Sequence, residues 1–276
     1  MRRMLAFEDV LAIAARSDAT RGIVLVGGQA LNFWSDYFEI VTPATEDKFG
    51  VALSNDIDFV GGAREATAFA AGVGGTVQIA GEADAHSPNT ALVTLRDGGD
   101  EHIVDFLGSL NGFSPREFEQ VAQWAVPVRL APETDAYLQV MHPVHCLQSQ
   151  LANVYGPSLD RRSGPGGERH ARRVRLAVEA SRRTVLDLLG RGAERNAFKV
   201  VERLHAVSLL EPALRARVLD GIEVECAIPV ARMPAIFRER RAESMQRALE
   251  LALGKYERLL ARRAAIATKK AAKKRR

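Results

Sequence analysis

The segments IVLVGGQALNFW at 23–34 and SNDIDFV at 54–60 decide the fold. The first begins with four aliphatic residues, mostly β-branched, which predict a short buried strand. The pair Gly27-Gly28 follows, and the residues from Gln29 onward predict the first turns of a helix. A strand that passes into a helix through two glycines leaves backbone N–H groups at the helix N-terminus, where a phosphate can bind.

The second segment alternates acidic and apolar residues. In a strand, Asp56 and Asp58 share one face, with Cα atoms about 6.5–7 Å apart, while the apolar residues between them point into the core. Residues 102–107 repeat the pattern around Asp105. If this strand lies beside the first, Asp105 joins the other two carboxylates, since neighbouring strands are about 4.8 Å apart. Three carboxylates beside a glycine-flanked helix N-terminus predict a site for Mg²⁺ and a nucleoside triphosphate.

These motifs resemble the nucleotidyltransferase superfamily, which includes DNA polymerase β and the aminoglycoside nucleotidyltransferases. The family signature is an apolar residue with Gly-Gly or Gly-Ser, then Asp-apolar-Asp/Glu, then a third acid on a later strand. It is matched by Val26-Gly27-Gly28, Asp56-Ile57-Asp58-Phe59 and Val104-Asp105-Phe106. The details GGQAL at 27–31 and SNDIDF at 54–59 are most similar to the AbiEii-like branch, the nucleotidyltransferase toxins of type IV toxin–antitoxin systems. The resemblance covers roughly the first half of the chain.

The resemblance implies a Mg²⁺-dependent enzyme that moves a nucleoside monophosphate from an NTP to an acceptor hydroxyl. It implies RNA, such as a tRNA-like molecule, as acceptor and an antitoxin as protein partner. Asp56, Asp58 and Asp105 would then be the catalytic and metal-binding residues, with two metal ions expected. Asp105 would complete the second metal site or act as general base.

Three kinds of residue are candidates for binding the nucleotide. The amides of Gly27 and Gly28 would hold its phosphates, and the hydroxyl of Ser54 matches a hydroxyl position in the resembling branch, although a turn before the strand explains Ser54 equally well. The third kind is a set of arginines that helical spacing places on one face, where they would contact triphosphate or an RNA backbone or simply face solvent: Arg169, Arg172 and Arg173.

One position departs from the resembling toxins, which carry an active-site lysine on the first helix after the sheet domain. The comparable stretch here has Gln148 and Gln150. Toxin-type activity would therefore need an arginine from the following cluster. Two alternatives remain: a catalytically silent nucleotidyltransferase-like module that binds nucleic acid, and a transferase acting on a small molecule such as an aminoglycoside.

Composition indicates an ordinary globular protein of 276 residues, 47% hydrophobic and 26% charged,. Two cysteines are too few for a disulfide framework. The N-terminal apolar run is interrupted by Glu8 and Asp9, so it makes a poor signal peptide. No uninterrupted apolar stretch is long enough for a membrane span, so we expect a cytoplasmic protein without a membrane partner.

Charge is divided unevenly along the chain. Residues 1–160 carry 9 Lys+Arg against 21 Asp+Glu, a net of −12, whereas residues 161–276 carry 29 against 13, a net of +16. An acidic half with the carboxylates, followed by a basic half, suits a metal site that faces a polyanionic substrate.

The pattern predicts an α+β fold: a nucleotidyltransferase-like domain with a small mixed β-sheet and flanking helices, followed by an all-helical C-terminal domain. Further strands are expected at 76–80 and 90–95, with an edge strand at 127–130, and long helices from residue 168 onward. His142, His145 and Cys146 lack a second ligand cluster at zinc-site spacing and predict a turn with a partly buried cysteine. We expect a catalytic domain at 1–140, a basic helical domain at 141–268 and a disordered basic tail at 269–276.

Overall fold

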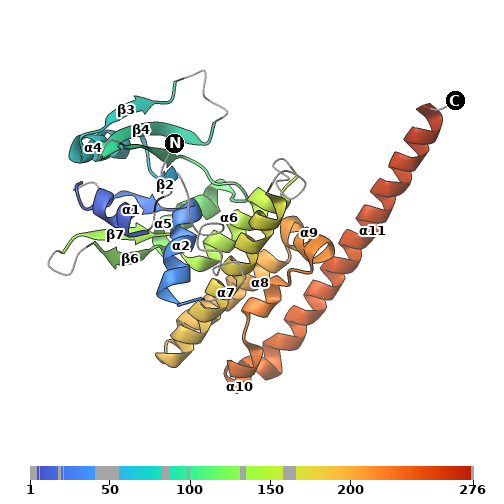
Figure 1. The fold of residues 1–276 in the computed structure, drawn as a ribbon. Coiled ribbons are helices and arrows are strands. Elements are labelled where there is room, and N and C mark those ends of the chain that lie inside the picture. The colour runs from blue at the N-terminus through green and yellow to red at the C-terminus, as the bar shows by residue number, and fades with distance from the viewer. Residues whose placement is uncertain are drawn as a thin grey trace. The chain divides into compact units, whose positions relative to one another are not determined.

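The protein is described from a computed structural model. It describes Leu5 and residues 7–17, 20, 22–40, 56–81, 87–97, 100–130, 135–157 and 166–274. Contacts divide the chain into two compact units, Met1–Ser181 and Arg182–Arg276. The fold is α+β, with a mixed sheet in the first unit and helices throughout the described residues of the second (Figure 1).

Seven strands form one mixed sheet in the order β3-β4-β5-β2-β1-β7-β6. Their bounds are β1 Val24–Leu25, β2 Asp56–Val60, β3 Thr76–Ile79, β4 Asn89–Asp97, β5 Asp100–Leu107, β6 Val126–Arg129 and β7 Tyr137–Val140. The strands predicted at 76–80 and 90–95 correspond to β3 and β4, and β4 pairs antiparallel with β5. The edge strand predicted at 127–130 corresponds to β6, which pairs with a strand that the sequence analysis did not assign, β7.

The strands that carry the acidic residues lie next to each other. β2 and β5 are parallel, and their register places Asp58 directly beside Asp105. Burial alternates along both strands, with the intervening apolar side chains fully buried and the aspartates half-buried. The prediction that the three acids belong to one sheet face is therefore supported by the register and by the burial pattern.

An aromatic cluster forms the core behind these strands. Phe59 of β2, Phe106 of β5 and Phe69 of helix α4 (Ala63–Val73) are fully buried. Their ring centroids lie 5.4–5.8 Å apart. Since neighbouring residues on a strand point to opposite faces, this core fixes the aspartates on the other side of the sheet.

The remaining helices of the first unit are α1 (Phe7–Ala14), α2 (Gly27–Tyr37), α5 (Pro115–Trp124), α6 (Pro143–Tyr155) and the first part of α7 (Gly167–Gly190). The indole Nε1 of Trp34 in α2 donates to the backbone oxygen of Met141, 2.7 Å away, just before α6. Nearly every residue of α6 is buried, including Cys146. This burial explains why α6 belongs to the first compact unit, although the sequence analysis set the domain boundary near residue 140.

The second unit begins within α7 and continues through α8 (Glu194–Ser208) and α9 (Glu211–Asp220). Short turns follow: η4 (Val224–Ala227), η5 (Val230–Arg232), α10 (Ala235–Phe237) and the π-helix η6 (Arg238–Ala242). The last helix, α11 (Glu243–Lys274), corrects the expectation of a disordered tail from residue 269, because it continues to Lys274. Alanine and lysine are strong helix formers, and no glycine or proline follows Gly254,. None of the helices in the described ranges is long and apolar enough to cross a membrane.

Candidate functional site

The site is built around a close approach between the start of α2 and strand β2. Helix α2 begins at Gly27 itself, two residues earlier than the sequence pattern predicts. Gly27 has φ +64°, and a Cβ atom there would lie 2.1 Å from Oδ2 of Asp58. The backbone N–H of Val26 donates to the backbone oxygen of Asp58 at 2.9 Å. Only glycine meets both demands, left-handed backbone and direct contact with a carboxylate.

This contact places a negative charge at the positive end of a helix. Val26 is the N-cap of α2, and its side chain makes no capping hydrogen bond. The N–H groups of the first turn have no acceptor within the helix. Asp58 therefore sits where the helix dipole favours an anion, and the same N–H groups point toward the site.

The third acid is held by an amide. Nδ2 of Asn89, at the start of β4, donates to Oδ1 of Asp105 at 2.9 Å. Two carboxylates on directly paired residues repel each other. The hydrogen bond from Asn89 fixes the position of the Asp105 side chain beside Asp58.

A cavity of about 360 Å³ opens in front of the glycine turn and β2. This volume falls within the usual range for small-molecule sites. The described residues that line it are Val26, Gly27, Gly28, Asp56, Asp58, Pro88, Leu107, Ser109, Leu110, Asn111, Ser149, Gln150, Asn153, Val154, His170 and Arg173. Four of the predicted site residues, both glycines and the two acids of β2, thus meet at one cavity, together with one of the predicted arginines.

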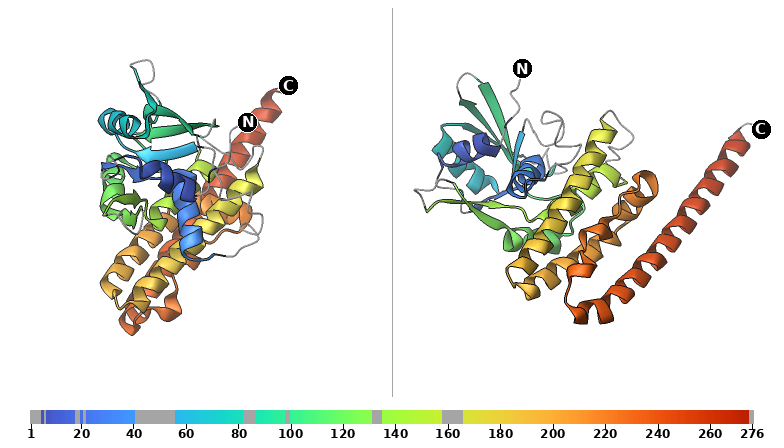
Figure 2. Two further views of the ribbon diagram at one scale, coloured as in Figure 1. Left: turned by 60° about the vertical axis from the view of Figure 1, so that its left-hand side comes forward. Right: turned by 60° about the horizontal axis from the view of Figure 1, so that its bottom comes forward.

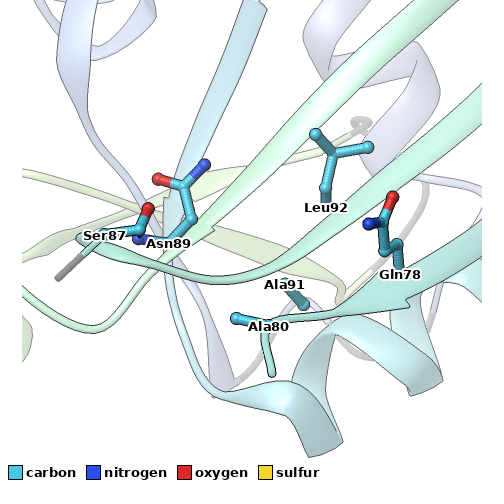
Figure 3. A pocket seen from close by; sticks show the side chains of 6 residues that line it. All are labelled: Gln78, Ala80, Ser87, Asn89, Ala91 and Leu92. Carbon is cyan, nitrogen blue, oxygen red and sulfur yellow. The ribbon is translucent and has the colours of Figure 1, made fainter. Parts of the chain in front are cut away.

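A second, smaller cavity of about 150 Å³ lies along strands β3 and β4 (Figure 3). Its described lining residues are Gln78, Ala80, Ser87, Asn89, Ala91 and Leu92. Asn89 thus contributes to this cavity while its amide supports Asp105.

The three predicted arginines are distributed differently from the expectation. Among them, Arg173 lines the large cavity, whereas Arg169 and Arg172 are absent from its described lining. Nε of Arg172 lies 3.6 Å from a carboxylate oxygen of Glu168, one turn earlier. The buried residues Ala171 and Val174 set the rotation of α7, and with it which arginine reaches the cavity,.

The two glutamines also differ from each other. Gln150 lines the cavity. Gln148 is buried, and its Nε2 donates to the backbone oxygen of Gly112 at 2.6 Å. Of the two glutamines, Gln150 is therefore the one that lines the cavity.

The histidines before and within α6 serve the packing of the first unit. Nδ1 of His142 accepts a hydrogen bond from the N–H of Val144 at 3.3 Å and so caps the helix. Burial lowers the pKa of His142 to about 4. Burial also raises the pKa of the Cys146 thiol, which keeps this thiol protonated. Cys146 is fully buried, more so than the sequence pattern predicts.

Amide side chains of the cavity wall were missed by the sequence analysis. Asn111 follows β5, Asn153 lies in α6, and Nδ2 of the first donates to Oδ1 of the second at 2.9 Å. Single asparagines in a loop and in a helix carry no spacing signal, so only the folded chain reveals them. Ser54 lies outside the described residues.

The donor atoms suit a hard cation that also binds phosphate. Within the described residues, no group of three His, Cys, Asp or Glu side chains is arranged to hold a metal ion by itself. Mg²⁺ is usually bound by one or two carboxylates together with substrate phosphates, not by a complete protein cage. Asp56 and Asp58 lie on the cavity wall next to the backbone N–H groups at the start of α2, which can donate to phosphate oxygens, so they fit that requirement.

Comparison with known proteins gives no assignment: no protein-family model, no curated protein and no solved structure matches the chain.

Proposed function

We propose that the first unit is a Mg²⁺-dependent nucleotidyltransferase of the DNA polymerase β-like superfamily. The observation that carries the proposal is the contact between Gly27 and Asp58 at the mouth of a cavity that Asp56 and Arg173 also line. It brings phosphate-binding N–H groups, two carboxylates and a cation to one place, the set that a nucleoside triphosphate with its metal requires.

Each residue has a defined task in the reaction. The N–H groups of Gly27 and Gly28 donate to oxygens of the departing phosphates, and Arg173 offsets their charge. Asp56 and Asp58 would hold the metal, and a bound magnesium ion would supply charge neutralisation and Lewis-acid polarisation of a phosphoryl group.

Transfer requires removal of a proton from the acceptor. Asp105, positioned by Asn89, accepts the proton of the acceptor hydroxyl,. The acceptor oxygen forms a bond to the α-phosphorus, while the bond to the β-phosphate oxygen breaks. Pyrophosphate leaves with that electron pair.

A labelling experiment tests the proposal. The protein is incubated with Mg²⁺ and each α-labelled NTP, with total RNA or an aminoglycoside as acceptor. We expect transfer of label with at least one NTP, and loss of transfer in Asp56→Asn. Glu101→Gln, an exposed acid on β5, is the matched control and should retain activity. Absence of label with every NTP and both acceptors, or full activity of Asp56→Asn, would refute it.

A further inference from the structure

Residues 261–270 of α11 are exposed around the whole circumference of the helix. Leu249 and Tyr256 pack with Leu214 of α9 and anchor the first half of the helix. From residue 261 to residue 270 every residue is exposed. Figures 1 and 2 show these turns extending beyond α9.

This exposed segment is strongly basic. Glu257 is the last acidic residue of the chain. Nη1 of Arg263 lies 3.3 Å from a carboxylate oxygen of Glu211, and both side chains are exposed, so this ion pair contributes little and can exchange,. A helix that holds like charges one turn apart is destabilised by their repulsion, and a polyanion relieves it.

The cations form two rows. At about 100° per residue, Arg258, Arg262 and Lys269 fall within about 40° of one another, and Arg263 and Lys270 form a second row about 100° away. Leu259 and Ile266, both exposed, lie between the rows. We call this surface the α11 basic face.

The opposite side of the helix argues against a membrane surface as the partner of the α11 basic face. Beyond Leu260, which packs against the cluster around Leu214, it carries alanines at 261, 264 and 267, with Thr268. A helix that lies in a bilayer interface needs bulky apolar residues opposite its cations, and these alanines do not provide them. The two exposed apolar residues between the cation rows are also too few for a membrane or coiled-coil seam.

We propose that the α11 basic face binds duplex DNA, with the helix in the major groove. This groove is about 12 Å wide and admits an α-helix. Two rows of cations match the two phosphate backbones that border it, and Leu259 and Ile266 face the groove floor, where thymine methyl groups are exposed. The deep, narrow major groove of A-form RNA does not accept a helix in this way. The proposal does not depend on the transferase function.

Fluorescence anisotropy with a labelled DNA duplex of about 20 base pairs, two helical turns, tests it. The intact protein should bind, with log K falling by about 0.9 per neutralised phosphate for each log unit of salt. Replacing Arg262, Lys269 and Lys270 with glutamine keeps helix propensity and should weaken binding at least tenfold, with a salt slope reduced by about 2–3.

The control removes equal charge elsewhere. Arg195, Lys199 and Arg232 are exposed in the same unit, and their triple glutamine variant should change affinity by less than about threefold if the site is local,. Equal losses in the two variants would show diffuse attraction and overturn the proposal. Tighter binding to an RNA duplex of the same length, or to vesicles containing phosphatidylserine, would also overturn it, as would no binding at low salt.

Discussion

Replacement of Gly27 by alanine tests the contact on which the site depends. The substitution forces a side chain onto a backbone with φ +64° and places a Cβ atom 2.1 Å from Oδ2 of Asp58. The Asp58 side chain must therefore rotate away from the start of α2. We expect both lower stability and loss of Mg·NTP binding.

The expected loss in free energy of unfolding has two parts, one from the backbone of residue 27 and one from the displaced Asp58 side chain. The left-handed backbone costs an L-residue about 1–2 kcal/mol. Displacing Asp58 costs about 0.5–1.5 kcal/mol if it leaves its rotamer, and about 0.3–1 kcal/mol in lost interaction with the helix dipole. Gly27→Ala should therefore lower the free energy of unfolding by about 2–4 kcal/mol.

A double-mutant cycle separates these parts. In an Asp58→Ala background the nearest side-chain atom left is the Cβ of residue 58, which lies 3.3 Å away in the native chain. Only the backbone cost should then remain, so the coupling energy should be about 1–2 kcal/mol. Gly74→Ala is a matched control, since Gly74 has φ +70° and nothing within 4 Å of its Cβ position.

Urea unfolding followed by tryptophan fluorescence measures these energies. Both tryptophans of the chain, Trp34 and Trp124, lie in the first unit, so the signal reports on that unit. Calorimetry with Mg·NTP gives the binding arm, in which Gly74→Ala should behave as the native protein. Equal destabilisation by Gly27→Ala in both backgrounds would refute the proposed contact with Asp58.

Further predictions concern the cavity wall and pH. Arg173→Gln should reduce NTP affinity severalfold, measured by calorimetry, while Arg172→Gln should leave it unchanged. Gln150→Lys should raise NTP affinity, whereas Gln148→Lys should instead lower the urea midpoint, because it buries a charge in place of a satisfied amide. Burial lowers the pKa of His142 from 6.5 to about 4. As pH falls from 6.5 to 4, the unfolded chain binds the proton first, so the first unit should lose up to about 1.4 kcal/mol per pH unit. His142→Asn, which keeps a cap acceptor, should flatten that slope in the urea midpoints.

The sheet's acidic strands could be predicted because their signal is local. Alternation with period two around Asp58 and Asp105 specifies which side chains are buried, and the register follows from that burial,. Strand β7 was missed because four residues carry too short a pattern. The choice of Arg173 over its neighbour Arg172 depends on the rotation of α7, which tertiary packing sets and spacing alone does not reveal.

The position of the domain boundary and the conformation of the basic tail depend on tertiary packing and on helix propagation, which local sequence does not reveal. Helix α6 follows the last strand in sequence and was therefore grouped with the later helices, but its burial joins it to the first unit. The basic tail has the composition of a solvated end, yet its alanines and lysines continue a helix that is already formed, so no nucleation cost arises.

Strand β1 joins the two parts of the sheet and has only two residues. It pairs with β2 on one side and with β7 on the other, through Val24 and Leu25. Local separation of β1 from β2 would break few hydrogen bonds, because β1 is so short. It would move Gly27 away from Asp58 without unfolding the aromatic core. A ligand that binds both the start of α2 and Asp58 would therefore oppose the separation of β1 from β2. Ligand binding would slow amide hydrogen exchange at Leu25 and Val26, and this effect would be detected at ligand concentrations too low to change the global free energy of unfolding.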